Sequence, residues 1–144
     1  MTSEEIRTLV KSHLDAWARE DVEALTRNYA ENCEVVSPMF HTVNGRAAVE
    51  TSLRNLFRGL QQWNVRIDDL LVDCSGNEER AALVMTVQAT QAGEMFGFPA
   101  SGRRMGLQAV HLYRFENGQI VAERRLYDFS GLLMQLGVLK AKMG

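Results

Sequence analysis

Cysteine and proline are scarce in this sequence of 144 residues, and long hydrophobic runs are absent. The two cysteines, Cys33 and Cys74, are far apart and have no companions at metal-ligand spacing. We therefore expect two reduced thiols in a cytoplasmic protein rather than a disulfide. The acidic start, Met1-Thr-Ser-Glu-Glu, is the wrong beginning for a signal peptide. No apolar run reaches membrane-spanning length, so we expect no membrane partner.

An excess of charge of either sign is also missing. Sixteen Lys and Arg against eighteen Asp and Glu give a net charge of −2, and the basic residues form no stripe with aromatics between them. Nucleic acid is therefore excluded as the expected partner. None of the three histidines pairs with another at metal-ligand spacing, and we expect no metal. Phosphate loops and nucleophile motifs are absent, which excludes nucleotide and acyl-enzyme chemistry. We expect no cofactor.

Helical periodicity dominates the first part of the chain. Apolar residues recur at helical spacing from Ile6 to Trp17, after the carboxylates of Glu4 and Glu5. A second helix is expected after Asp21, and a third over residues 47–60. A chain of this length with 46% apolar residues predicts a single domain over 1–144.

The period changes to two after residue 60. Strands are expected over 63–74, 81–92, 104–115 and 119–128, preceded by a short strand over 33–36 and followed by an apolar segment over 131–139. Asn117-Gly118 predicts a hairpin turn, because both positions of such a turn need positive φ. This order predicts an α+β fold with the helices on one face of the sheet. Both faces of the strands are apolar, so we expect the outer face to form a two-fold homodimer.

Several blocks along the chain resemble the SnoaL-like polyketide cyclases of the nuclear-transport-factor-two-like superfamily. The resemblance spans nearly the whole chain, and its last two blocks are the most specific. The blocks are Leu14-Asp15-Ala16-Trp17 with Asp21, Tyr29-Ala30, Asn44-Gly45-Arg46, residues 97–103 (GFPASGR), residues 113–120 (YRFENGQI) and residues 128–137 (DFSGLLMQLG).

The resemblance implies a cone-shaped, curved antiparallel sheet wrapped around N-terminal helices, usually in a dimer. It implies an apolar small-molecule ligand, a cyclic or aromatic carbonyl compound. Aldol cyclisation or isomerisation by cofactor-independent proton transfer is the implied reaction. The same fold also serves as a non-catalytic small-molecule-binding domain, which is the alternative function.

Asp128 is the first catalytic candidate. In the cyclases that the chain resembles, an aspartate at this position is the general acid and base. It follows the apolar run Ile120-Val121-Ala122, and burial would raise the pKa of its carboxyl toward the useful range. The alternative is that its side chain caps the C-terminal helix.

Arg124 stands where members of the family usually carry Trp, four residues before the aspartate. Strict alternation puts Arg124, Leu126 and Asp128 on one strand face. If that face lines the cavity, Arg124 would bind an anionic or enolate oxygen and Leu126 would contact the ligand. A β-bulge would exchange the faces and bring Arg125 inside. An exposed Arg124 at a strand end is the third possibility.

His111 lies in the third long strand, with the ligand-binding candidate Gln108 three residues before it. His111 is a candidate for a proton relay with Asp128. Counting outward from Asn117-Gly118, however, His111 pairs nearer to Ala122. The interpretation that we favour puts His111 on the outer face or at a dimer interface.

Large apolar side chains are candidates to line a cavity for a flat ring system, although in most small domains such residues only form the core. Glycines around the aromatics of segment 93–102 favour a mobile cavity rim. The ligand-binding candidates are Trp17, Tyr29, Phe40, Trp63, Met85 and Phe96.

Overall fold

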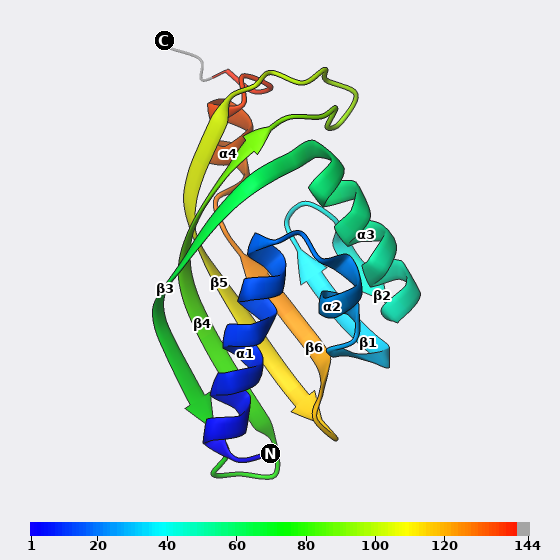
Figure 1. Cartoon of the computed structure of the whole chain (residues 1–144), viewed down its shortest axis with the longest axis vertical. Helices are drawn as coiled ribbons and strands as arrows, with labels where there is room; N and C mark the ends of the chain where they lie inside the picture. Colours follow the sequence, from blue (N-terminus) through cyan, green and yellow to red (C-terminus); the bar gives the residue numbers. More distant parts are fainter. Residues whose placement is uncertain (141–144) are drawn as a thin grey trace.

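The computed structural model describes residues 1–140 (Figure 1). Two helices are followed by two strands and a third helix, and four strands then follow one another before the last helix. The elements are α1 (Ser3–Ala18), α2 (Val22–Thr26), β1 (Tyr29–Ser37), β2 (His41–Asn44), α3 (Arg46–Gly59), β3 (Leu60–Asp73), β4 (Glu79–Gln91), β5 (Arg104–Glu116), β6 (Gln119–Leu126) and α4 (Phe129–Gln135).

The strands form one six-stranded sheet in the order β2-β1-β6-β5-β4-β3. The pairing is antiparallel except between β1 and β6, which run parallel. The helices lie on one side of this strongly curved sheet, with α1 crossing its concave face (Figure 1). The predicted α+β class is therefore confirmed, whereas the short strand β2 was not predicted.

Helix α1 begins with a capping box and buries one side. The Thr2 side chain accepts from the backbone N–H of Glu5, and the Glu5 side chain accepts from that of Thr2, so two N–H groups at the helix start are satisfied. Ile6, Val10 and Trp17 are buried toward the sheet. At 16 residues α1 is the longest helix, and within residues 1–140 none is long and apolar enough to cross a membrane.

The turn between β5 and β6 determines which residues face the helices. Asn117 and Gly118 both have positive φ (50° and 74°), which confirms the predicted hairpin turn. Glu116 pairs with Gln119 and Phe115 with Ile120, but Arg114 then pairs with Ala122. Val121 is therefore the extra residue of a β-bulge, and every later side chain of β6 faces the opposite way from an unbulged strand.

Helix α4 closes one end of the sheet. The Gln135 amide accepts from the Gly106 N–H at 2.8 Å and donates to the Gly106 carbonyl at 2.9 Å, which fixes the helix to β5. Gly137 ends the helix with φ +79°, and a Cβ there would lie 2.7 Å from the Arg103 guanidinium. These contacts explain why glutamine stands at position 135 and glycine at position 137 in the block of residues 128–137.

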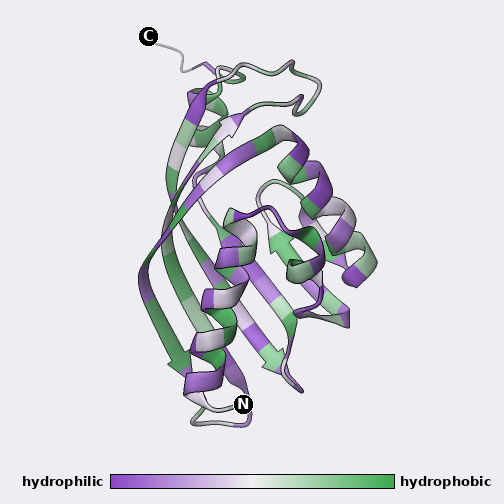
Figure 2. Ribbon diagram, in the orientation of Figure 1, coloured by the Kyte–Doolittle hydropathy of each residue, from purple (hydrophilic) through white to green (hydrophobic). Residues whose placement is uncertain are grey.

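The convex face of the sheet has no helix over it in the described part of the chain. Leu71, Leu112 and Leu126 are exposed there, at 60%, 39% and 48%. Leu112 lies at the centre, since its Cα partners are Ala82 on β4 and Arg124 on β6. Hydrophobic colour is evident at the carboxyl end of β3, where Leu71 lies (Figure 2).

Candidate functional site

A small cavity lies between the concave face of the sheet and the helices. Its volume is about 50 Å³. The walls are almost entirely apolar, and of the lining side chains only Arg125 is charged and only His111 is an imidazole. The lining residues are Trp17, Met39, Phe40, Leu56, Leu60, Trp63, Met85, Val87, Met105, Leu107, Ala109, His111, Arg125, Tyr127 and Leu132.

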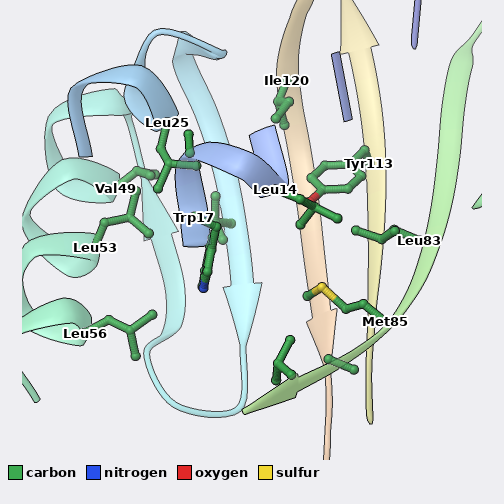
Figure 3. Packing of buried hydrophobic residues seen from close by; sticks show 14 of the residues in the cluster. Leu14, Trp17, Leu25, Val49, Leu53, Leu56, Leu83, Met85, Tyr113 and Ile120 are labelled. Carbon is green, nitrogen blue, oxygen red and sulfur yellow. The ribbon is translucent and has the colours of Figure 1, made fainter. Parts of the chain in front are cut away.

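Trp17 and Trp63 form one wall, and both pack edge-to-face on Phe57, which does not itself line the cavity. The ring centroid of Trp17 lies 5.4 Å from that of Phe57 and 5.7 Å from that of Trp63. Figure 3 shows Trp17 between the leucines of α3 and the sheet residues Met85 and Tyr113. The Trp63 indole N–H donates to the Leu60 carbonyl at 2.9 Å. The buried indole N–H of Trp17 has no acceptor within the described residues.

The cavity is smaller than an aromatic ligand requires, since small-molecule sites usually measure about 300 Å³ or more. Its lining includes Met39, Met85 and Met105, whose unbranched side chains repack readily. Met39 and Phe40 also border a second, more open hollow of about 210 Å³. Moving these two side chains would therefore connect the cavity to a larger space beside it.

A buried polar cluster lies behind the cavity. The Arg125 Nε donates to Oε2 of Glu123 at 2.6 Å, and both side chains are almost fully buried. The Tyr29 hydroxyl donates to Oε1 of Glu123 and lies 3.4 Å from Nη2 of Arg125. The Arg125 guanidinium carbon lies 5.1 Å from the centre of the Trp17 ring, a cation–π contact. These contacts hold the guanidinium in one place.

Two histidines belong to the same cluster. Nδ1 of His111 lies 3.2 Å from the Tyr113 hydroxyl and 3.5 Å from Oε2 of Glu123. His13 lies between the rings of Tyr29 and Tyr113. Its Nδ1 is 2.8 Å from the Asn28 amide nitrogen, whereas its buried Nε2 has no partner within residues 1–140.

Burial governs how these groups ionise. It lowers the pKa of His111 to about 3 and that of His13 to about 4, so both imidazoles are neutral near pH 7. Burial alone would raise the pKa of Glu123, but the charge of Arg125 lowers it to about 2. Burial raises the pKa of the Tyr29 hydroxyl well above its ordinary value. The cluster therefore contains one negative and one positive charge.

Arg125 retains hydrogen-bonding capacity toward the cavity. A guanidinium has five N–H donors. Glu123 accepts from Nε, and the Tyr29 hydroxyl lies within reach of one N–H of Nη2. No acceptor within residues 1–140 meets the other three. Three N–H donors of this guanidinium therefore have no protein acceptor in the described part of the chain, and the side chain lines the cavity.

Five of the predicted site residues lie together around the cavity: Trp17, Phe40, Trp63, Met85 and His111. The expectation that His111 faces outward was wrong. It pairs with Arg125 rather than near Ala122. An unbulged hairpin already puts Arg124 opposite His111, and the bulge at Val121 moves the partner one residue further.

The expected faces of Arg124, Leu126 and Gln108 were wrong, and for the two residues of β6 the bulge is the reason. Arg124 and Leu126 are exposed on the convex face, where Gln108 of β5 is exposed as well. Arg125 occupies the position toward the cavity that strict alternation gave to Arg124. The alternative with a bulge and an inward Arg125 is therefore the arrangement in the structure.

Asp128 lies at the start of α4 and is exposed. Its Oδ1 accepts from the Gly131 N–H at 2.9 Å, so Asp128 caps the helix. A Cβ at position 131 would lie 2.3 Å from the Asp128 carboxylate, which explains the glycine there. Tyr127, just before it, and Leu132 of α4 line the cavity, whereas Asp128 does not.

The two remaining ligand-binding candidates lie next to the cavity. Tyr29 is fully buried in the polar cluster behind it. Phe96 is exposed, borders the 210 Å³ hollow and packs edge-to-face on Phe129. Glu123 was missed altogether. A signal was present in the sequence, since Glu123 and Arg125 alternate on one strand face and could pair there.

Metal-ligating side chains do not cluster in the described residues, where no three of His, Cys, Asp and Glu could hold one ion. Both cysteines are free thiols, Cys33 buried and Cys74 exposed.

Comparison with solved structures gives the same architecture. AclR of Streptomyces galilaeus superposes with a TM-score of 0.81 at 23% identity, covering 96% of this chain and all of AclR. An NTF2-like protein of Burkholderia pseudomallei superposes with a TM-score of 0.75 at 20% identity, covering 94% of this chain and 98% of that protein. The fold is therefore NTF2-like, as predicted.

Sequence comparison identifies the family. The nogalonic acid methyl ester cyclase of Streptomyces nogalater is 33% identical over 72 residues, a match that spans about half of each protein (50% of this chain and 52% of the cyclase). The family model of the SnoaL-like polyketide cyclases matches residues 7–136, most of the chain. This chain belongs to the SnoaL-like polyketide cyclase family.

Proposed function

We propose that the chain is a cofactor-independent enzyme that moves a proton next to the carbonyl group of an apolar cyclic or aromatic compound. One observation carries the proposal: Arg125 and Trp17 both line an otherwise apolar cavity, and each has N–H donors without an acceptor within residues 1–140. A ligand that satisfies these donors needs an acceptor oxygen on an apolar body. A carbonyl compound has both.

Arg125 is the proposed oxyanion stabiliser. Removing a proton from the carbon beside a carbonyl moves negative charge onto the carbonyl oxygen. A fixed cation with free N–H groups in a water-poor cavity stabilises that charge more than it stabilises the neutral carbonyl. Glu123 and Tyr29 hold the guanidinium, so little reorganisation is needed during the reaction.

His111 is the proposed general base. A carboxylate can only accept, so Glu123 favours the tautomer with hydrogen on Nδ1 of His111. Nε2 then has a lone pair and takes the proton from carbon. In an aldol cyclisation the enolate carbon forms a bond to a second carbonyl carbon of the same molecule, and the new alkoxide takes the proton back from Nε2. In an isomerisation the proton returns to another carbon.

The cyclisation is supported by the relative that carries the name nogalonic acid methyl ester cyclase. Asp128 stays the other candidate for the proton transfer, because an aspartate has that role in the cyclases that the chain resembles. It would act from the rim of the cavity. A cytoplasmic location stays a prediction that is compatible with two free thiols.

Exchange of carbon-bound hydrogen in D2O tests the reaction without knowledge of the natural substrate. We expect the protein to accelerate deuterium uptake beside the carbonyl of 2-tetralone, measured by NMR. His111→Gln should slow the catalysed exchange by about 100-fold or more, the usual contribution of a general base. Asp128→Asn should leave it within a few-fold, since Asn also caps helices.

The opposite result, loss of exchange in Asp128→Asn alone, would assign the proton transfer to Asp128. Saturable quenching of tryptophan fluorescence by 2-tetralone without any catalysed exchange would favour the non-catalytic binding domain instead.

We also propose a homodimer through the convex face of the sheet, where Leu71, Leu112 and Leu126 are exposed. Sedimentation velocity of the wild-type protein should give a dimer at micromolar concentration. Leu112→Glu should give a monomer, because two carboxylates would then be buried at the centre of a two-fold contact. Met134→Glu, at a similarly exposed methionine of α4, is the matched control and should remain dimeric. A monomeric wild-type protein would contradict the proposal.

A further inference from the structure

We propose that Glu123 is a specificity-determining residue, which makes the cavity select neutral carbonyl ligands and reject carboxylate anions. The inference rests on the proposed function in that it concerns the ligand of the same cavity. It depends on the charges around that cavity rather than on the reaction.

The charged side chains at the cavity are Arg125, which lines it, and Glu123, which lies behind Arg125. Arg125 is the only charged residue among the lining side chains, and a lone guanidinium there would attract carboxylates strongly. Glu123 lies behind it, fully buried, with Oε2 at 2.6 Å from Nε of Arg125. The pair is neutral as a whole. A neutral carbonyl ligand keeps the buried region neutral, whereas a carboxylate would leave it with a net charge of −1.

No other group in the cluster offsets that extra charge. The side chains packed against the pair are His13 and Trp17 from α1, Tyr29 from β1, and His111 and Tyr113 from β5. An anion would need protonation of one histidine, and burial has lowered the pKa of both far below neutrality. Buried uncompensated charge is costly, so the anion is disfavoured near pH 7.

Glu123 meets the cavity only through its partners. It does not line the cavity, but it contacts Arg125, Tyr29 and His111 at once. Its effect on a ligand is therefore electrostatic rather than steric. Glu123→Gln removes the charge and keeps the shape. The Gln oxygen can accept from Arg125 Nε, and its amide can donate to the Tyr29 oxygen.

The test compares methyl benzoate with benzoate, which share a ring and differ in charge. Binding is followed at pH 7.5 by quenching of tryptophan fluorescence. Wild-type protein should bind the ester at least tenfold more tightly than the acid. In Glu123→Gln the ratio of the two affinities should shift toward benzoate by roughly 100-fold, because the acid now restores neutrality.

Glu116→Gln is the matched control for net charge, since Glu116 is exposed and paired with Arg114 on the surface. Its ratio should equal that of the wild type, and an equal shift in both variants would overturn the proposal as a general charge effect. An unchanged ratio in Glu123→Gln, or equal binding of ester and acid by the wild type, would also overturn it.

If Glu123→Gln folds poorly, its melting temperature is measured in the presence of each ligand instead. Benzoate should then raise its melting temperature more than methyl benzoate does, with the reverse order for wild type. The same order in both proteins would contradict the inference. None of these readouts requires turnover, so they separate this inference from the proposed reaction. Catalysed hydrogen exchange without a preference for the ester would refute only this inference. A preference for the ester without catalysed exchange would refute only the proposed reaction.

Discussion

Arg125→Met is expected to destabilise the protein by about 3–5 kcal/mol, because it leaves the Glu123 carboxylate buried without its cation. Methionine fills much of the volume of the arginine stem, so loss of charge rather than a cavity dominates the change. Urea denaturation at pH 7.5 measures the effect. Arg124→Met is the matched control one residue away. Its side chain is exposed, so a change within about 0.5 kcal/mol is expected.

A double variant separates charge from packing. Glu123→Gln combined with Arg125→Met removes both charges and should recover most of the stability lost in Arg125→Met, since the buried carboxylate is gone. Catalysed hydrogen exchange should stay about 100-fold or more below wild type in both variants, because the oxyanion donor is missing. If the double variant is no more stable than Arg125→Met, the ion pair is not the source of the loss.

The sequence predicted the helices and strands, but it could not predict that Arg125 rather than Arg124 faces the cavity. Apolar periodicity located the helices and the long strands, and Asn117-Gly118 located the hairpin turn. Three residues after this turn Val121 forms a β-bulge, and the bulge exchanges the two faces of β6. Arginine stands at both 124 and 125, so residue type could not reveal the exchange. Leu126 favoured the wrong face, because an apolar residue on the convex surface was read as a residue of the cavity.

The buried polar cluster was hidden for a related reason. Its members come from α1, β1, β5 and β6, and they meet only when the register of β5 with β6 is known. Glu123 stands in a charged run and was not singled out, and Arg125 faced inward only in the alternative with a β-bulge. His111 was assigned to the outer face by the same miscounted register. Asp128 was recognisable as a helix cap from local sequence, since Gly131 and the apolar residues after it supply the helix.

Acidification should destabilise the protein from about pH 6.5 downward, well above the range where carboxylates usually titrate. Unfolded histidines bind protons below about pH 6.5, whereas folded His13 and His111 resist protonation until about pH 4 and 3. The unfolded state therefore binds more protons, and the free energy of unfolding falls as pH falls. Each histidine should contribute a loss of roughly 2 kcal/mol at pH 5.

Glu123 extends the loss to lower pH. Its folded pKa of about 2 lies below that of an unfolded glutamate, so the stability that it contributes is present above about pH 4.5 and disappears toward pH 2. Histidine and glutamate thus act in the same direction in successive pH ranges. The free energy of unfolding, measured by urea denaturation between pH 7.5 and 4.5, isolates the histidines.

Replacing the buried histidines identifies the source of the slope. His13→Gln and His111→Gln should each remove about half of the decrease between pH 6.5 and 5, and the double variant should be nearly insensitive to pH in that range. His41→Gln is the control, because His41 is exposed at the start of β2 and should leave the slope unchanged. The variants are compared by slope rather than by absolute stability, since each also loses packing in the cluster. A double variant with the wild-type slope would show that the two imidazoles take up protons over the same pH range in the folded and unfolded protein, which would contradict the pKa values lowered by burial.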